Sequence, residues 1–177
     1  MRTRRWVIGV CALLTAGAAQ GEETYARVGG WQVSAEPPSH RCLMSRSYRS
    51  KDGKKIEDLT VLYAADKEGV LLIWSNDWMT YLPVKGDLEL GLAFKKGAVV
   101  DQSWEARNLH YDKVANTYHF TRAFTDPEEA RRILRNLADN ESIGLFLGPA
   151  LITSLPLDAS AAIEKLRECS LNGGRAQ

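Results

Sequence analysis

Apolar and polar residues alternate along much of the first two thirds of the chain, and this period of two is typical of half-buried β-strands. Residues 42–48 and 57–64 follow this pattern, and Asp52-Gly53 lies between them. An Asp-Gly pair between two alternating segments is a strong signal for a β-hairpin. If this two-residue turn sets the register, Met44 faces Val61 and Cys42 faces Tyr63.

Further strands are predicted on both sides of this hairpin. Trp31 and Val33 alternate with polar neighbours, and residues 70–74 are apolar throughout, as expected for a central strand covered on both faces. Residues 87–94 alternate, and a turn at 95–97 leads into a return strand over 98–104. The remaining expected strands lie at residues 109–111, 117–121, 143–147 and 151–155.

After residue 125 the period changes to that of a helix. Pro127 suits the first helical turn, and both Thr125 with Glu128 and Asp126 with Glu129 have capping-box spacing. Two buried stripes at helical spacing are expected, one formed by Ala130, Ile133, Leu134, Leu137 and Ala138, and one by Ala162, Ile163 and Leu166 in a short helix over residues 159–168. These elements predict the α+β class: a mainly antiparallel β-sheet, sandwich-like or curved, with two helices in the C-terminal half packed on it.

The first 19 residues have the order of a cleaved secretory signal peptide. Three arginines among the first five residues precede an apolar run over 6–14, and small residues follow over 15–19. Ala16 and Ala18 form an A-x-A cleavage site, and Gly17 with Ala19 is the alternative frame. The apolar run has about half of the roughly 20 residues that a membrane-spanning helix needs. We therefore expect export to the periplasm or the medium, by the general or the twin-arginine route.

One domain is predicted after the signal peptide. Residues 20–28 are polar and are expected to form a flexible leader, residues 29–171 a single α+β domain, and residues 172–177 a disordered tail. No later apolar stretch is long enough to span a bilayer. With three arginines removed, 20 basic residues face 22 acidic residues, a net charge of about −2. This balanced, dispersed charge favours neither nucleic-acid binding nor a polybasic contact with a membrane.

The three cysteines predict one disulfide bond. Cys11 is lost with the signal peptide, so Cys42 and Cys169 remain in an oxidising compartment, where two thiols usually pair. The alternatives are two free thiols or an intermolecular bond. An intramolecular bond would join the start of the domain to its last helix and would exclude a cysteine nucleophile.

The segment Gly30-Trp31-Gln32-Val33 after a signal peptide, followed by a cysteine in a short polar strand, resembles the start of the invasion-associated locus B family. The resemblance covers about 35 residues. It implies a small secreted or periplasmic bacterial protein with a β-rich fold and no known catalysis, and it supplies no site residues. The chain departs from the family at residues 34–36, where a cysteine is expected, at residues 155–158, and in the helix that ends at Cys169.

Two histidines form the sharpest candidate for a metal site. If the hairpin between residues 109 and 121 turns about Val114-Ala115, His110 lies directly opposite His119, with Cβ atoms about 5 Å apart. Two imidazoles so placed could bind Zn²⁺ or Cu²⁺, with Asp112 or Glu105 as a third ligand. The alternative is a polar, solvent-facing side of the sheet that carries two histidines, and a one-residue shift in register would separate them.

An aromatic segment provides a candidate partner-binding patch. Trp78, Met79 and Tyr81 lie beside an expected loop, and aromatic residues and methionine are enriched at binding surfaces. The alternative is that these residues close an open end of the sheet and belong to the core. Arg46 is expected on the same face as Cys42, where its guanidinium needs a carboxylate or carbonyl partner unless it extends to the edge.

The catalytic motifs G-x-S-x-G, H-E-x-x-H and C-x-x-C are absent from the sequence, as is a phosphate-binding glycine loop. The leading hypothesis is therefore an exported envelope protein without a cofactor that binds a protein or another envelope macromolecule. One alternative is a hydrolase with dispersed catalytic residues, which a deep pocket holding His40, His110 or His119 beside a carboxylate or serine would favour. The other alternative is a metal-binding module that uses His110 and His119.

Overall fold

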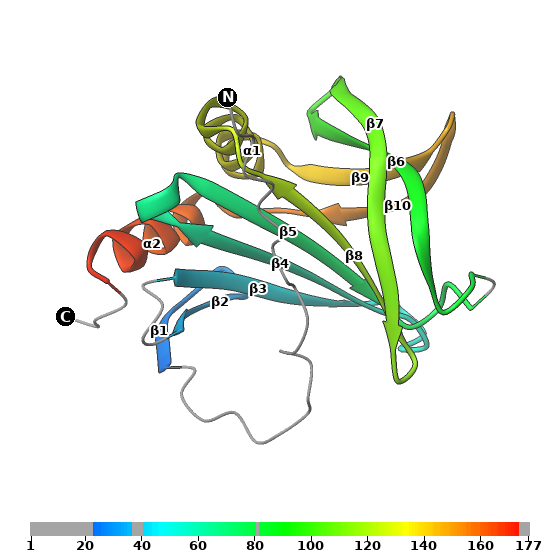
Figure 1. Cartoon of the computed structure of the whole chain (residues 1–177), viewed down its shortest axis with the longest axis horizontal. Helices are drawn as coiled ribbons and strands as arrows, with labels where there is room; N and C mark the ends of the chain where they lie inside the picture. The colour runs from blue at the N-terminus through cyan, green and yellow to red at the C-terminus, as the bar shows by residue number, and fades with distance from the viewer. Residues whose placement is uncertain (1–22, 37–40, 81, 174–177) are drawn as a thin grey trace, which may run out of the picture.

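The computed structural model describes residues 23–36, 41–80 and 82–173, apart from the side chains of residues 36, 101–103, 105, 106 and 108. In this part of the chain ten strands form one antiparallel sheet, and two α-helices lie in the C-terminal half (Figure 1). The predicted α+β class is confirmed. The strands are β1 (Glu23–Val28), β2 (Trp31–Glu36), β3 (Arg41–Arg49), β4 (Ile56–Ala64), β5 (Gly69–Asn76), β6 (Lys85–Lys96), β7 (Val99–Val114), β8 (Thr117–Phe124), β9 (Ser142–Leu147) and β10 (Ala150–Pro156).

The strand order is β1-β2-β3-β4-β5-β8-β7-β6-β9-β10. The Asp52-Gly53 turn gives the register predicted for β3 and β4, because Met44 pairs with Val61 and Cys42 with Tyr63. Gly53 has a positive φ of 69°, which glycine adopts without steric cost. Only local hairpins connect β1 to β5, whereas β8 returns to pair with β5.

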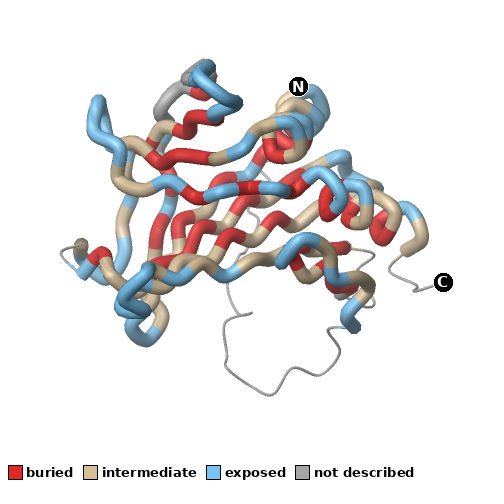
Figure 2. The backbone as a smooth tube through the Cα atoms, turned by 180° about the vertical axis from the view of Figure 1, so that it is seen from behind, coloured by how far each residue is buried: buried red, intermediate tan, exposed pale blue. Residues whose placement is uncertain are grey.

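The sheet is strongly curved, so that its two ends face each other across the core (Figure 1). The Thr153 hydroxyl on β10 donates to Glu57 on β4 at 2.9 Å, and the Trp74 indole N–H donates to the same carboxylate at 2.9 Å. Beyond β10, the Leu157 carbonyl accepts the indole N–H of Trp31 at 3.0 Å. Buried positions alternate along the strands and gather on the inner side of the curve (Figure 2). The largest of them include Trp31, Trp74, Phe94, Phe120 and Phe124.

The two α-helices are α1 (Pro127–Asp139) and α2 (Ser160–Leu171). At the start of α1, the Asp126 side chain accepts hydrogen bonds from the backbone N–H groups of Glu128 and Glu129, which satisfies two of the free donors at a helix N-terminus. The predicted stripe of α1 is buried at Ala130, Ile133, Leu134 and Leu137, and that of α2 at Ala162, Ile163 and Leu166. α1 packs against β5, β6 and β8, and α2 packs against β1 to β4.

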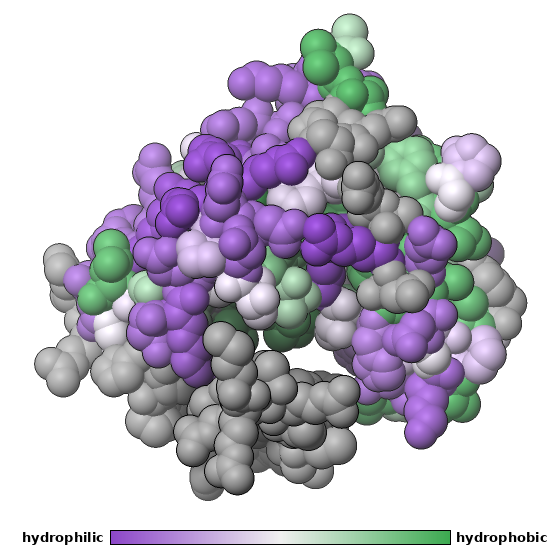
Figure 3. Space-filling model, turned by 45° about the horizontal axis from the view of Figure 1, so that its top comes forward, coloured by the Kyte–Doolittle hydropathy of each residue, from purple (hydrophilic) through white to green (hydrophobic). Residues whose placement is uncertain are grey.

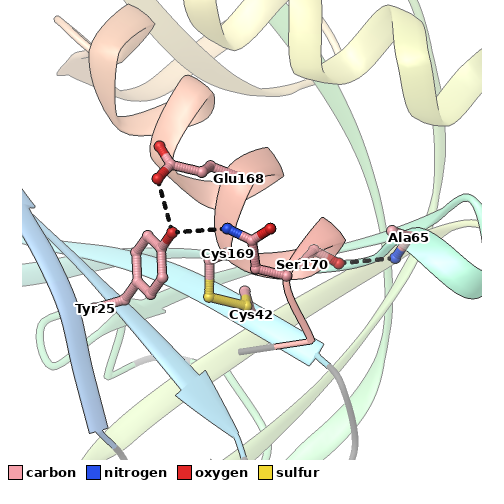
Figure 4. Close-up of a disulfide and its surroundings, with 7 residues drawn as sticks. Tyr25, Cys42, Ala65, Glu168, Cys169 and Ser170 are labelled. Atoms are coloured by element: carbon pink, nitrogen blue, oxygen red, sulfur yellow. Dashed lines mark hydrogen bonds between the residues drawn. A yellow bond between two sulfur atoms is a disulfide. The ribbon is translucent and has the colours of Figure 1, made fainter. Parts of the chain in front are cut away.

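The predicted disulfide joins α2 to the sheet. Cys42 on β3 is bonded to Cys169 on α2, and both residues are fully buried (Figure 4). On either side of this bond, the Tyr25 hydroxyl donates to Glu168 at 2.9 Å, and the Ser170 hydroxyl accepts the backbone N–H of Ala65 at 3.0 Å. The Asn172 side chain also donates to the Tyr25 hydroxyl at 3.4 Å, so the end of α2 is held by the disulfide bond and by hydrogen bonds to β1 and to Ala65.

The structure corrects the expected ends of the domain. Residues 23–28 of the expected leader form the edge strand β1, because Tyr25 and Ala26 pack against the core and Tyr25 bonds to α2. Asn172 and Gly173 of the expected tail close the last helical turn through backbone bonds to Glu168 and Ser170. The predicted signal peptide, residues 20–22 of the expected leader and residues 174–177 lie outside the described residues. Within the described ranges, no helix is long and apolar enough to cross a bilayer.

Candidate functional site

The expected direct pairing of His110 with His119 is wrong. His119 pairs with Asp112, and His110 pairs with Thr121, so the partner of each histidine lies two residues from the predicted one. The turn consists of Ala115 and Asn116, with Ala115 at a φ of 55°. The turn places the positive φ on Ala115, whereas a turn about Val114-Ala115 would include the β-branched Val114, for which a positive φ is a rare outlier. The Asn in the sequence was the available signal for this turn.

The two histidines point to different partners. His110 lies 3.2 Å from Asp87 on β6, and both of these side chains are more than half exposed. His119 shares a hydrogen bond of 2.8 Å with Ser75 on β5. Among the described side chains, no group of three or more His, Cys, Asp or Glu residues is placed to hold a metal ion. His40 lies outside the described residues.

A polar row crosses the outer face of the sheet at His119. Asp58, Ser75, His119 and Asp112 are successive register partners on β4, β5, β8 and β7. A histidine beside a serine hydroxyl can accept its proton, which is one requirement of acyl transfer. A second requirement is a set of hydrogen-bond donors for the oxyanion. The backbone N–H groups around Ser75 belong to paired strands of the sheet, so they do not provide these donors. A depression of about 290 Å³ lies elsewhere, in the β1–β2 hairpin, and is lined by residues 27–32.

The expected partner-binding patch is only partly exposed. Met79 is 1% exposed and is therefore a core residue, which corrects its assignment to a binding surface. The Asn76 side chain accepts its backbone N–H at 3.1 Å and so turns the loop inward. Trp78 is partly buried against the core, with the Lys55 ammonium 4.9 Å from its ring centre. Tyr81 lies outside the described residues.

Arg46 has the carbonyl partner that its inward position requires. Its guanidinium donates to the Leu157 carbonyl at 2.9 Å and lies 5.1 Å from the ring centre of Tyr48. Because the same carbonyl accepts the Trp31 indole N–H, both bonds fix the segment between β10 and α2 over β2 and β3. We interpret this cluster as structural.

The open edge of the sheet at β10 is a more suitable contact surface. β10 ends the strand order, and its other long side pairs with no described strand. Its sequence, ALITSLP, has no charged residue, and Leu151 is 55% exposed. Leu147 on β9 is 39% exposed, and Leu151 and Phe146 both lie close to Gly144. The hairpin lies at the right of Figure 1, and the same side carries apolar surface, green in Figure 3.

The opposite edge of the sheet, β1, carries charged residues and is covered by a helix. β1 carries Glu23 and Arg27, and α2 packs against it through the bond between Tyr25 and Glu168. Charged residues and covering elements are the usual means by which proteins prevent pairing at a sheet edge. Of the two edges, only β10 therefore combines unpaired backbone groups with exposed aliphatic side chains and no charge.

Sequence reasoning identified β10 as a strand over 151–155 but could not identify it as an edge. An uncharged strand can lie at the centre or at the edge of a sheet, and only the strand order distinguishes the two positions.

Comparison with known proteins gives no further assignment: no family model matches the chain, and neither does any curated protein or solved structure.

Proposed function

We propose that this protein is an exported interaction protein of the bacterial envelope that binds an extended segment of a partner protein at β10. The observation that carries the proposal is the uncharged, unpaired edge strand with Leu151 exposed. An extended peptide can add to such an edge through backbone hydrogen bonds, while pockets for alternate side chains provide specificity.

The disulfide and the signal-like first 19 residues support export. A buried disulfide persists in oxidising compartments and is rare in the cytosol. The resemblance of residues 30–33 to the invasion-associated locus B family points to the same compartment. A bond between β3 and α2 keeps the fold rigid, which lowers the entropic cost of presenting a fixed strand to a partner.

The test uses two matched substitutions on the exported, tagged protein. Leu151→Lys places a charge on the open edge, and Val84→Lys places the same charge on an exposed position (66%) in the loop before β6. After crosslinking in the native envelope, we expect the wild type and Val84→Lys to capture the same partner and Leu151→Lys to lose it. Equal capture by all three proteins would contradict binding at β10.

A second candidate function is hydrolysis, because Ser75 and His119 lie within hydrogen-bond distance. The test is labelling with a fluorophosphonate probe, with Ser75→Ala as the control. Labelling of the wild type that disappears in Ser75→Ala would favour the hydrolase over the interaction protein. We expect no labelling of either protein, because the strands around Ser75 offer no free oxyanion donors.

A further inference from the structure

Arg122 is a buried cation without enough hydrogen-bond partners. It lies on β8 between Phe120 and Phe124 on the inward face, and it is only 6% exposed. Among the described residues, neither its Nε nor its Nη1 has a hydrogen-bond partner. Burying a charged donor without a partner is costly, so nearly all buried charges in proteins are paired.

The fold creates this position at a seam between two strands. Pairing between β7 and β8 ends where His110 meets Thr121, one residue before Arg122. β8 remains paired with β5 at this point, and Arg122 is the register partner of Leu72 on β5. α1 packs against β8, and its Glu129 and Arg132 contact Arg107 and Trp104 on β7, so that the seam is bounded by β7, β8 and α1.

Aromatic rings line the seam and provide one further free donor. The Arg122 guanidinium lies 5.6 Å from the ring centre of Trp104 and 5.0 Å from that of Phe124, and Arg132 lies 4.4 Å from Trp104 on α1's side. The buried indole Nε1 of Trp104 has no hydrogen-bond partner among the described residues. Cation–π contacts offset part of the cost of burying Arg122, but they leave these N–H groups unbonded.

A second arginine and one carboxylate act on the charge of Arg122. Burial lowers the pKa of Arg122, and repulsion by Arg107 adds to this effect. Glu129 opposes the shift, but its carboxylate is already bonded to Arg107 at 2.7 Å. The carboxylate that acts on Arg122 is thus shared with a second arginine, which bridges β7 and α1 at the surface of the seam.

We propose that this seam binds an oxyanion of the phosphate type, which accepts hydrogen bonds from Arg122 and from the indole of Trp104. A phosphate group has several acceptor oxygens and can serve donors that do not share a plane, and arginine is a preferred partner for it. This site is separate from β10 and does not depend on the interaction proposed there.

The test is a titration of the disulfide-intact protein with inorganic phosphate, with chloride at matched ionic strength as the blank. A ligand that binds only the folded state raises the melting temperature increasingly as its concentration exceeds its dissociation constant. We expect phosphate to raise it, and Arg122→Gln to weaken the apparent affinity by about 10- to 100-fold. The matched control is Arg131→Gln, which removes an exposed arginine of α1 that pairs with Glu68, and it should titrate as the wild type does.

Glu129→Gln keeps the test decisive if Arg122→Gln does not fold. Removing the competing carboxylate should tighten phosphate binding, whereas a purely structural Arg122 would give no change in affinity. To separate free phosphate from a lipid headgroup, the wild type is also sedimented with phosphatidylglycerol vesicles and with phosphatidylcholine vesicles. Binding of phosphate without preference for the anionic vesicles assigns the site to a free phosphate group. No response to phosphate, or identical titrations of the wild type, Arg122→Gln and Glu129→Gln, would overturn the proposal.

Discussion

Cys42 and Cys169 are bonded within the core, with Cα atoms 6.1 Å apart although 127 positions separate them in sequence. The bond links β3 near the start of the domain to α2 at its end, and therefore constrains nearly the whole unfolded chain. In the chain-entropy model, closing a loop of this length contributes about 4 to 5 kcal/mol to the free energy of unfolding.

Replacing both cysteines with alanine should therefore lower the free energy of unfolding by about that amount. Urea denaturation of the oxidised wild type and of the double variant measures the difference. Alkylation of the native, non-reduced protein followed by intact-mass analysis provides the control, and it should find no free thiol. Two alkylatable thiols in the native protein would contradict the bond.

Tyr48 should report the burial of its hydroxyl at alkaline pH. Burial raises its pKa from 10.0 to about 12, with Arg46 opposing the shift. Because the folded pKa lies above the unfolded one, the contribution to stability is constant below pH 10.0 and is lost as the pH rises toward about 12. Absorbance of tyrosinate should show a late-ionising component that Tyr48→Phe removes.

The same substitution should not lower stability at neutral pH. The Tyr48 hydroxyl is buried and has no hydrogen-bond partner among the described residues, so its removal relieves a desolvation cost. We expect Tyr48→Phe to leave the free energy of unfolding unchanged or to raise it by up to about 1 kcal/mol. A clear loss of stability would mean that the hydroxyl has an acceptor in solution.

Glu168 should make the contact between α2 and β1 sensitive to acid. Hydrogen bonds from Lys165 and then Tyr25 lower its pKa from the ordinary value of 4.5. A lowered folded pKa means that its contribution to stability is present above pH 4.5 and is lost as the pH falls through the folded value. Asp52 has a lowered pKa as well and also contributes to the pH dependence of stability. The quantity to measure is therefore the difference in the free energy of unfolding between the wild type and a Glu168 variant.

The comparison is between the wild type and Glu168→Gln in urea denaturation from neutral to acidic pH. The wild type should be the more stable protein at neutral pH, and the two should converge as Glu168 becomes protonated. A difference that stays constant across this pH range would show that the carboxylate contributes no pH-dependent stability.

The predicted signal peptide leads to a simple mass measurement. If the cleavage site formed by Ala16 and Ala18 is used, the exported protein begins at Ala19, and with the alternative frame it begins at Gln20. Intact mass of protein recovered from the periplasm or the medium distinguishes these ends. Exported protein that still begins at Met1 would contradict cleavage.

Local signals in the sequence predicted most of the elements, but the strands expected at residues 98–104 and 109–111 are parts of one strand, β7. Asp52-Gly53 and the Asp126-Pro127 start of α1 each act within a few residues, and both lie where they were expected. The predicted pairing of His110 with His119 was wrong because it depended on which two residues form the turn between β7 and β8. A shift of that turn by one residue changes every cross-strand pair after it.

The parts that the sequence could not predict depend on contacts between distant segments. The curvature that brings Thr153 to Glu57 joins residues 96 positions apart and has no local signature. Arg122 continues the inward alternation of Tyr118 and Phe120, and that pattern was a usable signal for a buried charge. Whether such a position meets a partner is decided by the separation of β7 from β8, which only the fold shows.

Site-specific photocrosslinking in living cells tests the proposed function most directly. A photoreactive amino acid is placed at Leu151 on the open edge, and in a second protein at Val84, which is similarly exposed. Binding of a partner segment along β10 predicts one discrete adduct from Leu151 and none from Val84. The same adduct from both positions, or none from Leu151 in exported, disulfide-bonded protein, would contradict the account.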